Sequence, residues 1–176
     1  VSGNIMIDNP NYNFTDKTLK AGLDVSATDR SESSGFESSR TGFVLGTGFE
    51  QYEDLFFSPE ITVAFEEIEV DESASTSIKN MEGDFFNIDF TYGLALDKRD
   101  QSWKPTEGYR TTFRQALPIV QDSSAIENAL QISTYHDFSD DVIGSIKFHA
   151  STINGLDDDV RLTKRLYIPR NNLRGF

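Results

Sequence analysis

The residues best suited to chemistry lie at the end of the chain, in RLYIPRNNLRGF, residues 165–176. This stretch contains Arg165, Arg170 and Arg174 and no acidic residue, although the whole chain has a formal net charge of -13. A guanidinium group binds a carboxylate through a pair of parallel hydrogen bonds, so an arginine loop beside acidic walls is suited to anchoring rather than to proton transfer. The alternative is a solvated surface loop whose arginines offset the surrounding acidity.

Other reactive residue types form no catalytic pattern. The aspartates of 157–159 lack the spaced glycine and closing glutamate of a calcium loop, which favours an exposed acidic loop. His136 and His149 have no Ser–Asp arrangement for hydrolysis. The Gly-Thr-Gly of 46–48 is not followed by a helix, so it is not a phosphate loop. With no cysteine in the chain, the sequence predicts no catalytic residue, no metal site and no cofactor, and hence no enzyme.

Length and charge narrow the class of protein. The 176 residues are enough for one domain. No apolar run approaches the roughly 18 residues of a transmembrane helix, and the start does not resemble a signal peptide. The chain begins with Val1 rather than Met, which predicts a piece of a longer protein. The negative charge argues against nucleic-acid partners, because phosphates would be repelled.

Alternation of apolar and polar residues is the strongest structural pattern. In residues 86–94, large apolar residues occupy every even position and small or polar residues every odd one. A period of two predicts a strand with one apolar face. The pattern recurs in residues 2–7, 19–28, 42–49, 61–66, 109–119, 130–135 and 142–150. The sequence therefore predicts an all-β antiparallel meander of about eight strands.

Alternation alone fits both a soluble sandwich and a membrane barrel, in which the apolar face meets lipid and the polar face lines the lumen. Two features favour the barrel. The polar face is rich in Gly, Ser and Thr with some charges that could pair, rather than the dense Lys/Glu mix of a soluble surface. Aromatic residues gather near strand ends, as in outer-membrane girdles. The charges on the polar face are Asp24, Asp89, Arg110, Arg114 and Lys147. The aromatic residues near strand ends are Tyr52, Phe56, Phe57, Phe85, Trp103, Tyr109 and Phe138.

The links between the expected strands differ in length. Residues 29–35 and 71–84 form polar even-numbered links, whereas the odd-numbered links around 50–54 and 136–141 are short. Outer-membrane barrels have short periplasmic turns and longer external loops, so we expect odd links in the periplasm and even links outside. The fifth link, around residues 95–110, is long and departs from this rule.

Two motifs carry a family resemblance. The fifth link resembles the D-x-R-D…P-T-x-G hairpin of the bacterial surface antigen family of outer-membrane barrels, and the chain's last residues match that family's V/L-R-G-F/Y motif. Ile168 and Pro169 replace the glycines usual before the second motif. The hairpin residues are Asp97, Arg99, Asp100, Pro105, Thr106 and Gly108, and the loop residues are Leu173, Arg174, Gly175 and Phe176.

The resemblance, which is to BamA-type barrels in particular, implies a transmembrane barrel of about sixteen strands. Residues 1–154 would supply strands from its middle, from about the fourth to the eleventh. Residues 155–176 would form a long loop folded into the lumen, where Arg174 pairs with an acidic residue of a later strand, Gly175 allows close approach and Phe176 wedges the tip.

The implied function is an assembly factor that inserts and folds β-barrel proteins into the bacterial outer membrane. The implied partners are outer-membrane lipid and lipopolysaccharide, unfolded outer-membrane protein clients and accessory lipoproteins. Two alternatives stay open. One is a TamA-like or two-partner-secretion translocator, and the other is a small eight-stranded barrel that binds a ligand or serves only as structure.

Overall fold

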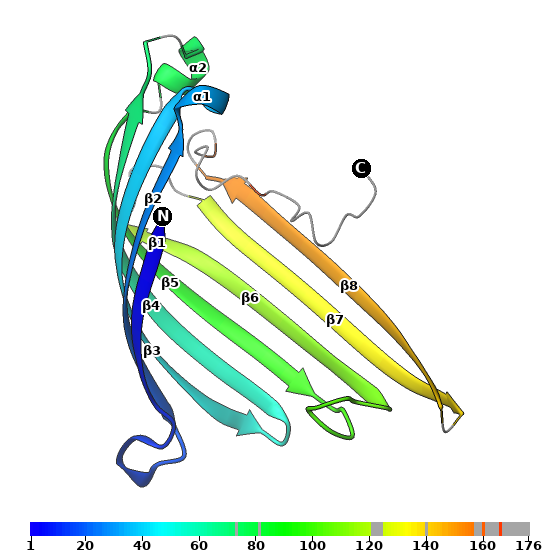
Figure 1. Cartoon of the computed structure of the whole chain (residues 1–176). Coiled ribbons are helices and arrows are strands. Elements are labelled where there is room, and N and C mark those ends of the chain that lie inside the picture. Colours follow the sequence, from blue (N-terminus) through cyan, green and yellow to red (C-terminus); the bar gives the residue numbers. More distant parts are fainter. Residues whose placement is uncertain are drawn as a thin grey trace.

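The computed structural model contains one antiparallel sheet in which the strands follow one another in chain order (Figure 1). It describes residues 1–72, 74–80, 82–120, 125–139, 141–156, 160 and 166. The strands are β1 (Ser2–Asn9), β2 (Thr18–Arg30), β3 (Phe36–Tyr52), β4 (Leu55–Val70), β5 (Gly83–Asp97), β6 (Gly108–Val120), β7 (Ala125–Ser139) and β8 (Val142–Gly155). The predicted all-β meander is confirmed.

Only short helices occur, and all of them lie in links between strands. A 3-10 helix, η1 (Tyr12–Phe14), follows β1, whereas α1 (Ser31–Ser34) and α2 (Thr76–Lys79) lie at the opposite end of the sheet (Figure 1). The alternating pattern did not predict these turns. None of the helices in the described part of the chain has the length and hydrophobicity to cross a membrane.

The sheet is an open, curved wall in the described part of the chain. Each strand pairs with its neighbours in sequence, and no pairing between β1 and β8 occurs among the described residues. The described strands therefore do not close into the small eight-stranded barrel considered above. Exposed edges of this kind present unpaired backbone groups, which a larger barrel satisfies with further strands.

Cross-strand register sorts the side chains onto two faces. On the face that we call outer, Leu23 pairs with Phe43, and Phe43 pairs with Val63 of β4. Leu23 is 44% exposed and Phe43 48% exposed. On the other face, which we call inner, Asn87 and Thr91 of β5 are only 3% and 4% exposed. Apolar side chains thus point outward and polar ones are enclosed, the reverse of a soluble domain and the expected arrangement for a membrane barrel.

The register between neighbouring strands shifts at three places among the described residues. Two of them lie beside the β3–β4 and β7–β8 turns, and the third is a bulge on β6, opposite Ile88 and Asp89 of β5. Ile88 pairs with Val120, but the next residue, Asp89, pairs with Pro118, so Ile119 is the extra residue. Proline cannot donate a ladder hydrogen bond, and within a sheet it is tolerated at such bulges. The bulge explains why a proline can lie near the end of a strand that has neighbours on both sides.

Aromatic residues concentrate at the end of the sheet that holds the odd-numbered links. Exposed members of this group include Tyr52, Trp103 and Phe138, at 69%, 79% and 71%. This position fits the predicted aromatic girdle. Phe56 and Phe85 differ from that expectation, because their register partners Ala95 and Glu66 belong to the inner face.

Candidate functional site: the inner face and the β5–β6 hairpin

Ion pairs join different strands on the inner face. Arg40 of β3 pairs with Asp24 of β2, and Arg114 Nη2 of β6 lies 3.3 Å from Glu60 Oε1 of β4. Gly42 makes room for the first pair, since a Cβ there would lie 2.5 Å from the Asp24 carboxylate. The register also places the other charges expected on the polar face on this side of the sheet. These are Asp89, Arg110 and Lys147.

The inner face contains a polar hollow of about 300 Å³. Its charged lining consists of Glu66, Asp89 and Glu127 together with Arg40 and Arg114. Glu66 is only 7% exposed. Carboxylates outnumber guanidinium groups here, so the hollow is suited to a further cationic side chain in a partly dry lumen.

A second and smaller hollow, of about 140 Å³, lies toward the odd-link end of the same face. Arg99, Arg110 and Lys147 contribute positive charge, and Ser133 and Tyr135 contribute hydroxyl groups. Arg99 and Arg110 both lie beside the Asp97 carboxylate, which offsets part of this positive charge. The second hollow is therefore less acidic than the first.

The β5–β6 hairpin is held by an ion-pair cluster at the end of β5. Arg99 Nε and Nη2 donate to the two carboxylate oxygens of Asp97 at 2.7 and 2.6 Å. Arg110 Nε lies 3.6 Å from the same carboxylate. The Arg99 side chain is only 13% exposed, so this bidentate pair is less screened by water than an ordinary surface pair.

Asp100 holds the returning half of the same hairpin. Its carboxylate accepts hydrogen bonds from the Thr106 amide at 3.0 Å, the Thr106 hydroxyl at 2.9 Å and the Glu107 amide at 3.2 Å. Desolvation alone would raise the pKa of Asp100, but these hydrogen bonds outweigh it and leave the pKa below its ordinary value. The carboxylate thus works as an ionised cap on the turn. Pro105, which precedes Thr106, is half-buried, and its ring fixes its own backbone φ.

Gly108 closes the hairpin where a side chain would not fit. Its φ is +94°, and a Cβ would lie 2.1 Å from the Lys98 carbonyl oxygen. Beside it, the Lys98 amide donates to the Tyr109 carbonyl at 2.8 Å. Five of the six predicted hairpin residues therefore make ion pairs, hydrogen bonds or close backbone contacts within the hairpin. The sixth, Pro105, restricts the backbone through its fixed φ. The loop motif, Leu173 to Phe176, lies outside the described residues.

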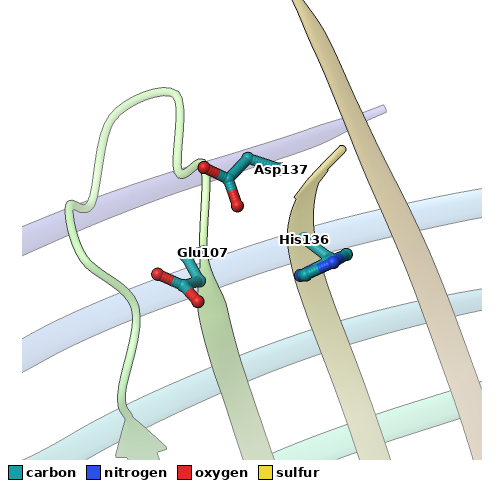
Figure 2. Close-up of side chains that lie close together, drawn as sticks. All are labelled: Glu107, His136 and Asp137. Atoms are coloured by element: carbon teal, nitrogen blue, oxygen red, sulfur yellow. The ribbon is translucent and has the colours of Figure 1, made fainter. Parts of the chain in front are cut away.

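Three potential metal ligands that sequence reasoning did not group also meet at this end of the sheet. Figure 2 shows Glu107 near His136 and Asp137, whose ligand atoms all lie within 4.8 Å of one another. The pairing of Gly108 with Tyr135 is the signal that brings these links together. All three side chains are exposed, and no second feature of the described residues points to an ion, so we assign them no metal.

Comparisons with known proteins agree with this geometry. Residues 2–176 match the family model described as the Omp85 superfamily domain. A solved structure titled as BamA from Haemophilus ducreyi lacking POTRA domains 1-3 superposes with a TM-score of 0.76 at 14% sequence identity. The match covers 89% of this chain and 33% of that chain, so the present chain spans about a third of that structure. No curated protein matches the sequence.

Proposed function

This chain belongs to the Omp85 superfamily, and we propose that it supplies part of the wall of a BamA-like barrel that inserts and folds other β-barrel proteins into the bacterial outer membrane. The observation that carries the proposal is the two-faced sheet, apolar outside and polar inside, on a BamA-like fold. The proposed partners are outer-membrane lipid with lipopolysaccharide, unfolded barrel clients and accessory lipoproteins. Neither an enzyme activity nor a nucleic-acid partner forms part of the proposal.

The proposed role needs no covalent chemistry. An unpaired strand edge offers backbone donors and acceptors to an incoming strand, which can add to it without ATP. The seam that would do this lies in strands outside this chain. The segment described here would keep the barrel rigid and hold the lumen polar while the seam opens.

We assign the loop of residues 155–176 to the lumen and residues 1–154 to the barrel wall. The acidic hollow lined by Glu66, Asp89 and Glu127 supports this assignment, because residues 160–176 of the loop carry four arginines, one lysine and no acidic residue and are attracted to such a surface. Arg174 then pairs with a carboxylate on a later strand. The pair positions the loop and does not transfer a proton.

Paired alanine variants of the full-length protein test the loop. Arg174→Ala should lower the level of correctly folded outer-membrane proteins and slow growth more than Arg165→Ala, because only the first removes the bidentate anchor. Heat-modifiable mobility of the barrel itself shows whether each variant has folded. Equal growth and equal client levels for both variants would contradict the lumen role.

A translocator is the second candidate, because the polar hollows make a continuous hydrophilic lining possible for a transported chain. Vesicles containing the full-length protein separate the two functions. An assembly factor should leave a client barrel folded in the vesicle membrane, whereas a translocator should deliver its client to the protected interior. Protease digestion from outside distinguishes these products, and cell fractionation tests the proposed outer-membrane location.

A further inference from the structure

A chain of hydrogen bonds crosses the outer face of the second half of the sheet. Tyr92 Oη donates to Gln115 Oε1 at 2.8 Å, and Gln115 Nε2 donates to Asn128 Oδ1 at 2.6 Å. Asn128 Nδ2 then donates to Thr152 Oγ1 at 3.2 Å. The four residues are direct register partners on β5, β6, β7 and β8. We call them the polar row.

The polar row lies within an apolar surface. Along β5 it is flanked by Phe90 and Leu94, and the Tyr92 ring approaches those of Phe57, Phe90 and Phe113 at centroid distances of 6.2–6.3 Å. Amide groups at such positions are costly in lipid unless they are hydrogen-bonded. Mutual pairing explains how they are tolerated, but not why apolar residues do not replace them.

The hydrogen bonds within the polar row leave some of its N–H and O–H donors unused. A primary amide carries two N–H donors, and among the described residues the side chains of Gln115 and Asn128 each use one. The Thr152 hydroxyl accepts from Asn128, and among the described residues it donates to none. These leftover donors form a short line on the face that meets lipid. These donors would be satisfied by a group that offers hydrogen-bond acceptors and no donors.

The depth of the polar row identifies such a group. Asn128 lies about 10 Å along β7 from its start at Ala125, and Thr152 lies a similar distance from the end of β8 at Gly155. Strand tilt reduces that distance along the membrane normal. This places Asn128 and Thr152 just inside the membrane surface, where the carbonyl groups linking acyl chains to lipid headgroups lie, whereas Gln115 lies deeper, about 17 Å along β6 from its end at Val120. Lipid carbonyls accept hydrogen bonds and donate none.

We propose that Asn128 and Thr152 form a lipid-binding line that hydrogen-bonds the acyl-linkage carbonyls of the adjacent leaflet, with Gln115 holding the Asn128 amide in place. The inference rests on the membrane-facing position of the outer face and holds for an assembly factor and a translocator alike. If either proposed function is disproved, the lipid-binding proposal still stands. If the lipid-binding proposal is disproved, both functional proposals still stand.

Ester and ether lipids test the line directly. The full-length protein is folded into vesicles of dimyristoyl phosphatidylcholine and of its dialkyl ether analogue, which lacks the carbonyls. Wild-type protein should unfold in urea about tenfold more slowly in the ester vesicles, as expected for one or two hydrogen bonds. In Asn128→Leu/Thr152→Val, which removes both proposed donors, this ratio should fall to about one. Thr111→Val, on the same face but away from the polar row, is the matched control and should keep the wild-type ratio.

Milder variants protect the test against a folding failure. Asn128→Leu leaves the hydrogen bond from Tyr92 to Gln115 in place and leaves only the Thr152 hydroxyl as a donor in the line, so it should weaken the low-frequency shoulder of the lipid carbonyl band that wild-type protein produces in the infrared spectrum. An equal ester-to-ether ratio in wild type and double variant would overturn the proposal. So would efficient crosslinking between two barrels through Thr152→Cys, because the line would then contact a second copy of the protein.

Discussion

The inner and outer faces of the sheet use the same backbone but handle polar groups in opposite ways. On the inner face, charges are numerous and pair across strands, as in Arg114 with Glu60. On the outer face of β5–β8, the hydrogen-bonded polar groups are neutral, and they are gathered into the polar row from Tyr92 to Thr152. Adjacent residues in one strand therefore meet different solvents.

The difference shows what each solvent permits. In a wet lumen, an ion pair costs little to form and little to break, so charges can be scattered over the wall. In lipid, an unpaired polar group costs several kcal/mol, which favours neutral groups that satisfy one another. The polarity of a residue thus depends on which face of the sheet its side chain occupies, and not on which strand it belongs to.

The largest expected effect comes from placing a charge on each face of one strand, which tests whether the two faces meet different solvents. Ile61→Lys puts an ammonium group into lipid near the middle of β4 and should destabilise the barrel by about 2–4 kcal/mol. Thr62→Lys puts the same group into the acidic hollow and should cost less than about 1 kcal/mol. Urea unfolding of the full-length protein in vesicles measures both.

Equal destabilisation by the two lysines would show that the faces do not meet different solvents. A larger effect of Thr62→Lys would reverse their assignment. Either result would contradict the interpretation of the alternating pattern as a membrane barrel.

The hairpin where β5 turns into β6 offers the next largest effect. Gly108→Ala places a Cβ against the Lys98 carbonyl at a φ of +94° and should cost about 1–3 kcal/mol. Gly3→Ala is the control, because a Cβ there would meet nothing within 4 Å. The unfolding midpoints of the two variants give the comparison. A stable Gly108→Ala barrel would mean that the hairpin can rearrange freely.

A smaller effect should follow from weakening one inner-face ion pair. Glu60→Gln removes the charge opposite Arg114, whose side chain is 60% exposed, so the cost should be about 0.2–1 kcal/mol. Arg114→Gln alone and in combination with Glu60→Gln completes a double-mutant cycle. A coupling energy of several kcal/mol would indicate that this part of the lumen excludes water.

The smallest expected effect is a pH dependence confined to the hairpin. The pKa of Asp100 is lowered in the folded protein, so its stabilising contribution is complete above the ordinary aspartate pKa of about 4. It is lost as the pH falls through the lower folded-state pKa. The protection factors of the Thr106 and Glu107 amides against hydrogen exchange should fall over that range in wild type and show no such pH step in Asp100→Asn.

Sequence alone predicted the faces because a strand reverses its side-chain direction at each residue. Phe86, Ile88 and Phe90 needed no knowledge of their neighbours to be assigned to one side. The hairpin could also be anticipated, since proline and glycine restrict or release φ locally.

Contacts between distant parts of the chain could not be predicted in the same way. The meeting of Arg114 with Glu60, and of Glu107 with His136, depends on exact register between strands. Register is a property of pairs of strands, and a bulge such as the one beside Asp89 shifts it locally. The polar row was missed for this reason, because its members look like isolated exceptions when each strand is considered alone.

The bulge beside Asp89 has a consequence for how this wall can change during evolution. Deleting one residue from an uninterrupted strand would turn everything beyond that point inside out, with ion-paired residues in lipid and aromatic rings in the channel. Deleting two preserves the sidedness. Length variation in these strands should therefore occur in steps of two, except where an irregularity such as that at Pro118 absorbs an odd residue.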